Sequence, residues 1–112
     1  MLEIATSSGS TTITVVGDLD VTARDQFPEM TARVSGLGRQ LLVLDLCRME
    51  FMDSTGAAFV AVCGEQTRRG GGVALLRGAD EHARFVLEVC GVLPLFRVDT
   101  DHACEQDEPL PA

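Results

Sequence analysis

The sequence LVLDL at residues 42–46 runs through four more residues into FMDSTG at residues 51–56. The first segment is a continuous apolar run of branched residues, a pattern that predicts a buried strand. The second places Ser54 between Asp53 and Thr55 at the start of a predicted helix of small residues. A helix start offers backbone N–H groups without intrahelical acceptors and the positive end of the helix dipole. Ser54 is therefore a candidate helix cap, phosphate acceptor or nucleophile.

The whole chain of 112 residues has the length of one domain, and 46% of its residues are apolar. Its formal net charge of −8 repels nucleic acid and anionic membrane surfaces and favours a partner with a basic face. No apolar stretch approaches the roughly 20 residues that cross a bilayer, and the start MLEI does not resemble a signal peptide. We therefore expect a cytoplasmic protein that binds neither nucleic acid nor membrane.

Strands and helices alternate after an initial hairpin. Strand-like segments are predicted at residues 2–6, 11–16, 41–46, 73–76 and 96–99. Helices are predicted between Thr22 and Gly36, over residues 55–69, and between Asp80 and Gly91. The order β-β-α-β-α-β-α-β predicts an α/β domain with a mostly parallel mixed sheet, an N-terminal hairpin and a cover of helices. Residues 105–112 are acidic and proline-rich, which predicts a disordered tail.

The predicted helices carry recognisable start signals. Thr22 is predicted to cap the first helix, with Asp25 three residues later in a variant of the capping box. Pro28 lies inside this helix and predicts a kink or a late start, because proline removes a helical hydrogen bond. Asp80 is predicted to cap the third helix.

The four cysteines are expected to be free thiols. Cys47, Cys63, Cys90 and Cys104 show no Cys-x-x-Cys spacing. Cys63 falls in the apolar pattern of the second helix, and Cys90 falls in the predicted inner stripe of the third. A free thiol packs there like a small hydrophobe. Simple packing is therefore predicted in preference to a disulfide or a metal site.

A nucleophilic role for Ser54 lacks supporting groups. A hydrolase serine needs a base within hydrogen-bond reach and an oxyanion site. The Gly-x-Ser-x-Gly turn is absent, because Met52 occupies the first glycine position. The two imidazoles, His82 and His102, fall in a helix start and near the chain end, where histidines are mostly solvated. We therefore expect no catalytic residue and no enzyme.

Phosphoryl and metal chemistry are also disfavoured. The chain contains no lysine, so Asp45 and Asp53 lack the partner that a phospho-aspartate site requires. The glycine run at residues 70–72 lacks the Lys-Ser/Thr of a phosphate-binding loop and is predicted to be a turn. Asp18 and Asp20 flank a strand-to-helix turn, where paired acids usually cap backbone groups. No cofactor and no metal are expected.

Two interpretations of Ser54 remain open on local chemistry. It is a helix cap, with Asp53 as a competing cap, or it is a phosphorylation site. A phosphate adds a charge of about −1.5 to −2, which the helix start favours and Asp53 opposes. Asp20 is expected at the same edge of the sheet, because functional residues collect at the carboxyl ends of parallel strands. Small residues cover more than one face of the helix, which a partner surface and tight packing on the sheet explain equally well. These residues are Gly56, Ala57, Ala58, Val60, Ala61 and Gly64.

The segment DLCRMEFMDSTGA at residues 45–57 resembles the signature of the STAS domain, and within that family it resembles the anti-sigma factor antagonists. The sequence GDLD at residues 17–20 is similar to the family's Gly-Glu-Leu-Asp turn. The resemblance covers about residues 2–104 and implies a STAS domain over residues 1–104. It implies a serine, here Ser54, that a partner anti-sigma factor serine kinase phosphorylates and a serine phosphatase restores. It also implies that the unphosphorylated form binds the kinase and so releases a sigma factor.

The resemblance further implies a docking face and leaves one alternative. The implied partner-binding residues are Asp20, Asp53, Ser54, Thr55, Gly56, Ala57 and Val60. The chain departs from the family at Cys47, where serine or threonine is common, at Ala57, where leucine is frequent, and at Pro28. The alternative is a STAS accessory or scaffold subunit of a transporter or signalling complex, with Ser54 only a cap. The retained Asp-Ser-Thr-Gly favours the switch.

Overall fold

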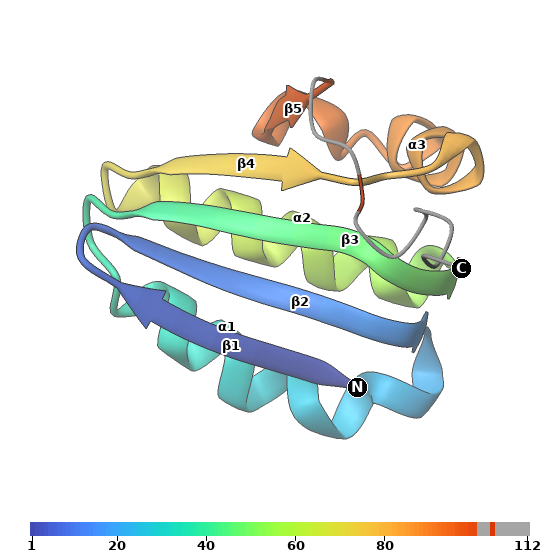
Figure 1. Ribbon diagram of the computed structural model, residues 1–112, viewed down its shortest axis with the longest axis horizontal. Helices are drawn as coiled ribbons and strands as arrows, with labels where there is room; N and C mark the ends of the chain where they lie inside the picture. Colours follow the sequence, from blue (N-terminus) through green and yellow to red (C-terminus); the bar gives the residue numbers. More distant parts are fainter. Residues whose placement is uncertain (101–103, 105–112) are drawn as a thin grey trace, which may run out of the picture.

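The computed structural model describes residues 1–100 and 104 and has the predicted order of elements (Figure 1). The strands are β1 (Leu2–Ser7), β2 (Ser10–Leu19), β3 (Leu41–Met52), β4 (Val73–Arg77) and β5 (Arg97–Asp99). The helices are α1 (Phe27–Ser35), α2 (Ser54–Arg69) and α3 (Glu81–Val89), with 3-10 turns η1 (Val21–Gln26) and η2 (Leu93–Leu95). The predicted α/β fold class is confirmed. His102 and the predicted tail at residues 105–112 lie outside the described residues.

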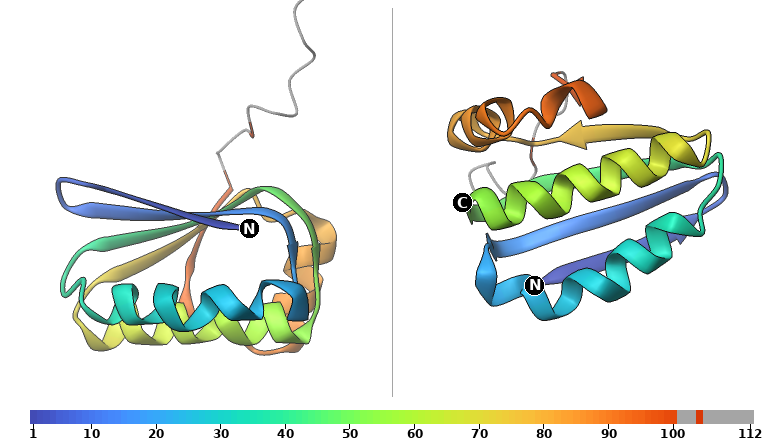
Figure 2. Two further views of the ribbon diagram at one scale, coloured as in Figure 1. Left: turned by 90° about the horizontal axis from the view of Figure 1, so that it is seen from below. Right: turned by 180° about the vertical axis from the view of Figure 1, so that it is seen from behind.

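The five strands form one sheet in the order β1-β2-β3-β4-β5. β1 runs antiparallel to β2, and the other neighbouring pairs are parallel. Helices α1 and α2 lie side by side along one face of this sheet (Figure 2). Because β2, β3 and β4 are parallel, η1, α2 and α3 all begin at the same edge of the sheet.

The core lies between the sheet and these two helices. Alternate residues of β2 are buried, as period-2 side-chain geometry requires of a strand with one covered face. The fully buried strand side chains include Ile13, Val15, Leu42, Leu44 and Leu76. Burial of each such side chain stabilises the fold by about 1.5–3 kcal/mol.

Strands β2 and β3 are longer than predicted. Their pairing continues to Leu19↔Met52, with register shifts between Thr14 and Val16 and between Gly17 and Asp18. Residues 47–52 are therefore strand, although the sequence predicts that the strand ends at residue 46. Arg48 and Glu50 interrupt the apolar run, whereas backbone pairing with the end of β2 continues the strand.

The first helix starts late, as Pro28 predicts. Turn η1 comes first, and α1 begins at Phe27 with the proline in its first turn. The predicted Thr22 cap is wrong, because Asp20 is the cap residue and its side chain accepts a hydrogen bond from the Thr22 N–H at 2.9 Å. Thr22 already lies within the turn, so its N–H needs an acceptor.

The prediction of four free cysteines is also wrong. Cys47 of β3 and Cys104 form a disulfide across a sequence separation of 57 residues. Cys63 is buried and free, as expected, but Cys90 is exposed at the C-cap of α3 and is not part of its inner stripe. The disulfide forms because the order of strands in the sheet brings Cys47 and Cys104 together. The spacing of the cysteines in the sequence does not reveal this.

Candidate functional site

The start of α2 is capped by Asp53, which leaves Ser54 without a capping role. The Asp53 backbone is extended, and its Oδ1 accepts hydrogen bonds from the N–H groups of Thr55 at 2.9 Å and Gly56 at 3.1 Å. Two of the orphan donors at the helix start are thereby satisfied. Ser54 is the first residue of the helix and is exposed. Its hydroxyl has no hydrogen-bond partner within the described part of the chain.

Asp20 lies at the same edge of the sheet, at the end of β2. Its Oδ1 accepts hydrogen bonds from the hydroxyl and from the backbone N–H of Thr22. Both bonds lower the pKa of the Asp20 carboxyl, because they stabilise its charged form. The bond from the Thr22 hydroxyl has the larger effect, and the bond from the Thr22 N–H has the smaller one. The carboxylate is therefore ionised and fixed in direction at neutral pH.

Backbone contact between β2 and α2 joins the two parts of the site. Leu19 pairs with Met52 across the sheet, so Asp20 and Asp53 follow paired positions. A Cβ at Gly56 would overlap the carbonyl oxygen of Leu19, so only glycine allows the helix to approach this closely. We call the edge formed by Asp20, Asp53 and Ser54 the acidic rim. Neither of its two carboxylates forms an ion pair with a residue that the structure describes.

Burial divides the predicted partner-binding residues into two groups. Asp20, Asp53 and Thr55 are half-buried and Ser54 is exposed. Gly56, Ala57 and Val60 are buried on the sheet side of α2, the last two with no exposed surface. Burial on the sheet side keeps the side chains of Ala57 and Val60 away from solvent, and the assignment of all three residues to the docking face stays a prediction. In the structure they hold the helix in place.

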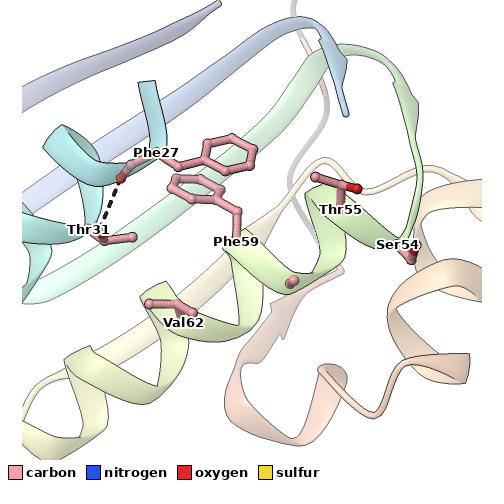
Figure 3. A pocket seen from close by; sticks show the side chains of 7 residues that line it. Phe27, Thr31, Ser54, Thr55, Phe59 and Val62 are labelled. Atoms are coloured by element: carbon pink, nitrogen blue, oxygen red, sulfur yellow. Dashed lines mark hydrogen bonds between the residues drawn. The ribbon is translucent and has the colours of Figure 1, made fainter. Parts of the chain in front are cut away.

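An open apolar groove adjoins Ser54, between α1 and α2 (Figure 3). It has a volume of about 470 Å³. The rings of Phe27 and Phe59 stack in it with centroids 4.4 Å apart, which fixes the two helices relative to each other. The seven lining residues are Phe27, Thr31, Ser54, Thr55, Ala58, Phe59 and Val62. The groove therefore offers an apolar surface with a hydroxyl at one end.

Sequence reasoning missed most of this groove. Ser54, Ala58 and Val62 are spaced four residues apart and so lie on one helix face, a signal that the sequence contains. The contribution of Phe27 and Thr31 depends on how α1 packs against α2 and has no comparable local signal.

Among the described residues, Ser54 has neither a histidine base hydrogen-bonded to it nor a cluster of metal ligands beside it. His82 stacks on the ring of Phe51, with centroids 5.9 Å apart, and no hydrogen bond joins it to Ser54 among the described residues. Residues 1–100 and 104 contain no group of three or more potential metal ligands. Within the same part of the chain, no helix has the length and apolar character to cross a bilayer.

The fold and this helix start define a class of small α/β domain with an Asp-capped helix and an exposed serine at its first position. Residues 1–104 match the STAS domain. The chain belongs to the STAS domain family. The resemblance stated from the Asp-Ser-Thr-Gly segment is thereby confirmed, and no curated protein matches the chain.

Three solved structures show the same fold at low sequence identity. The phosphorylated form of the Bacillus cell fate determinant SpoIIAA is 20% identical with a TM-score of 0.69, covering 90% of this chain and 93% of that one. An anti-sigma factor antagonist from Mycobacterium paratuberculosis is 20% identical with a TM-score of 0.71, covering 89% and 85%. An anti-sigma-factor antagonist (STAS) domain protein from Planctomyces limnophilus is 17% identical with a TM-score of 0.76, covering 94% and 91%.

Proposed function

We propose that this chain is a cytoplasmic anti-sigma factor antagonist. It binds an anti-sigma factor serine kinase while Ser54 is unmodified and thereby releases a sigma factor. The kinase phosphorylates Ser54 and ends the complex, and a serine phosphatase restores binding. One observation carries this proposal. Asp53 caps the start of α2, so the exposed Ser54 hydroxyl forms no hydrogen bond within the described chain.

The capping arrangement supports the interpretation of Ser54 as a phosphorylation site. If Ser54 were the cap, its oxygen would accept a backbone N–H and phosphorylation would damage the helix. Because Asp53 takes the N–H groups of Thr55 and Gly56, the serine can be modified while the helix keeps its cap. Phosphorylation is therefore expected to change the surface and leave the fold intact.

The added charge of phospho-Ser54 is expected to weaken binding to the kinase surface that binds the unphosphorylated chain. A phosphate adds a charge of about −1.5 to −2 to a rim that already carries Asp20 and Asp53. No described arginine pairs with these carboxylates, so the added charge is not neutralised within the described chain. The phosphate would also lie at the end of the apolar groove. There it would bring a hydrated charge next to any apolar side chain of the partner bound in the groove.

The proposed docking face combines the rim and the groove. Asp20, Asp53, Ser54 and Thr55 would contact polar or basic groups of the partner. Ala58 and Val62 would meet an apolar side chain in the groove. Residues 1–104 are proposed to suffice for this binding, with residues 105–112 dispensable.

The proposal is tested by incubating the full chain with candidate anti-sigma kinases and ATP and locating phosphate by mass spectrometry. Phosphate is expected on Ser54, and the Ser54→Ala variant should remain unmodified. Thr55→Val is the matched control, since it removes the neighbouring hydroxyl and should be phosphorylated normally. Phosphate on Thr55 instead, or none with every kinase encoded in the genome, would contradict the proposal.

Binding is measured separately by calorimetry with the same kinases. Ser54→Ala is expected to bind as the unmodified chain does and to stay active, whereas Ser54→Asp should bind more weakly. Equal affinity of these two variants would place the docking face elsewhere. That result would favour the alternative of an accessory or scaffold subunit of a transporter or signalling complex, in which Ser54 has no regulatory role.

A further inference from the structure

The disulfide between Cys47 and Cys104 joins elements that are not neighbours in the sheet. Cys47 belongs to β3, and Cys104 follows β5, with β4 lying between the two strands. An ion pair between Arg77 of β4 and Asp99 of β5, at 3.8 Å, lies close to it along the same edge. The bond therefore links β3, two residues past the end of its pairing with β4, to Cys104 beyond β5.

Gly78, directly after β4, provides the space in which the two sulfurs sit. Its φ of +75° is in the left-handed region, which glycine adopts without strain. A Cβ at this position would overlap Cys47 Sγ and lie 3.0 Å from Cys104 Sγ. The backbone at Gly78 thus fits closely beneath the bonded pair, which is a second feature, independent of the cysteines, that matches their pairing.

Cys47 and Cys104 are partly accessible to solvent, whereas Cys63 is buried. Cys47 and Cys104 are both half-buried, and Cys47 lines an open hollow of about 430 Å³ together with Arg48 and Met49. Cys63 has no exposed surface, and burial raises the pKa of its thiol to about 12, which suppresses the reactive thiolate. Cys90 is exposed and unpaired among the described residues. The chain thus contains three kinds of cysteine that one reagent can tell apart.

We propose that Cys47 and Cys104 form a reversible redox site that links β3 to the chain beyond β5, across Gly78 at the end of β4, and releases this link on reduction. Strand pairing through backbone hydrogen bonds does not require the bond, so the domain keeps its fold when the bond is open. Disulfides rarely persist in reducing compartments, so a pair that is reachable from solvent is suited to exchange there.

The oxidant belongs to the class of low-molecular-weight disulfides. The thiolate of one cysteine attacks the small disulfide, which forms a mixed disulfide and releases one small thiolate. The thiolate of the other cysteine then attacks the protein sulfur of this mixed disulfide, which forms the Cys47–Cys104 bond and releases the second small thiolate. Two electrons pass to the small molecule, and the two protons lost by the cysteines protonate its thiolates.

The bond acts on the loop that leads to α3. Gly78 lies beneath the sulfurs, and Asp80 caps α3 two residues later through a hydrogen bond from the Ala83 N–H at 2.8 Å. The Cys47–Cys104 bond, which packs against Gly78, is therefore expected to restrain the start of α3. His82 in this part of the helix stacks on Phe51 of β3.

Alkylation of the folded, full-length chain tests the pairing without any partner or kinase. After treatment with oxidised glutathione and its removal, Cys47 and Cys104 should resist a thiol reagent, whereas Cys90, which has no paired thiol to release the glutathione, should carry either glutathione or the label. After dithiothreitol without denaturant the thiol reagent should also label Cys47 and Cys104, and Cys63 should react only when the chain is unfolded. Labelling of Cys47 and Cys104 in the oxidised sample would refute the pairing. Release of the pair only in denaturant would show a permanent structural bond and refute reversibility.

Glycine variants test whether Gly78 is built around the bond. Gly78→Ala is expected to slow disulfide formation at least about tenfold. Gly91→Ala is the matched control, because Gly91 has a similar φ of +72° but open space around it, and it should leave the rate unchanged. Equal rates in the two variants would contradict the role of Gly78. If Gly78→Ala does not fold, hydrogen exchange replaces it: reduction should speed amide exchange at residues 78–80 in the wild type and have no effect in Cys104→Ser.

Discussion

Helices α2 and α3 begin in the same way and differ at their first residue. In each helix an aspartate caps the start, Asp53 through the N–H groups of Thr55 and Gly56 and Asp80 through the N–H of Ala83. The residue after the cap is exposed in both. In α3 it is Glu81, an acidic side chain, whereas in α2 it is Ser54, a neutral hydroxyl. The comparison teaches that this fold already accommodates a negative charge at the corresponding position of a second Asp-capped helix.

The third helical residue should show the largest difference between the two starts. Ala83 is buried and has room for its Cβ, whereas a Cβ at Gly56 would overlap the Leu19 carbonyl oxygen. Gly56→Ala is therefore expected to lower the free energy of unfolding by at least about 3 kcal/mol, because backbone must move. Urea denaturation followed by circular dichroism measures this loss.

A second glycine variant serves as the control for that measurement. Gly36 has an ordinary φ of −91°, and the nearest atom to an added Cβ is 3.6 Å away. Gly36→Ala is expected to change the free energy of unfolding by less than about 0.5 kcal/mol. A Gly56→Ala variant as stable as Gly36→Ala would mean that α2 does not sit as close to β2 as described.

Loss of the two caps should have a smaller and graded effect. Asp53→Ala leaves two N–H groups without their acceptor and is expected to cost about 1–2 kcal/mol, whereas Asp80→Ala leaves one and should cost about 1 kcal/mol. The asparagine variants keep an acceptor oxygen and should recover most of each loss. Thermal unfolding of the four variants measures the order. Equal costs at the two sites would mean that the second bond of Asp53 contributes little.

Much of this comparison could be foreseen from the sequence, and the reasons for the exceptions are physical. The alternation of apolar runs and helical patterns predicted the order of elements, and Asp80 before a helical stripe predicted its cap. At α2 both Asp53 and Ser54 have oxygens that can accept the same N–H groups, so the sequence left the cap open. Burial of Gly56 and Val60 depends on the depth at which α2 meets β2, which local periodicity does not specify. The Cys47–Cys104 bond depends on strand order across 57 residues.

A third aspartate cap extends the comparison to pH. Hydrogen bonds from the Thr22 hydroxyl and N–H lower the pKa of Asp20 below its usual value of 3.8. A lowered pKa in the folded chain contributes stability above the unfolded value, and this contribution is lost as pH falls through the folded value. The wild type should therefore lose more stability on acidification below about pH 4 than Asp20→Asn does. Parallel acid-induced unfolding curves for the two proteins would contradict this.

Ser54→Glu should have the smallest effect on stability and so separates surface from fold most sharply. The variant gives α2 the same start as α3, aspartate followed by glutamate, and the helix dipole favours the new charge. The free energy of unfolding is expected to change by less than about 0.5 kcal/mol. The reciprocal variant Glu81→Ser is the matched control and should be equally neutral. Affinity for the kinase partner should nevertheless fall at least about tenfold in Ser54→Glu, about 1.4 kcal/mol, and be unchanged in Glu81→Ser. Stability lost in Ser54→Glu alone would show that the two helix starts are not equivalent, and a phosphate on Ser54 would then act by disturbing the fold.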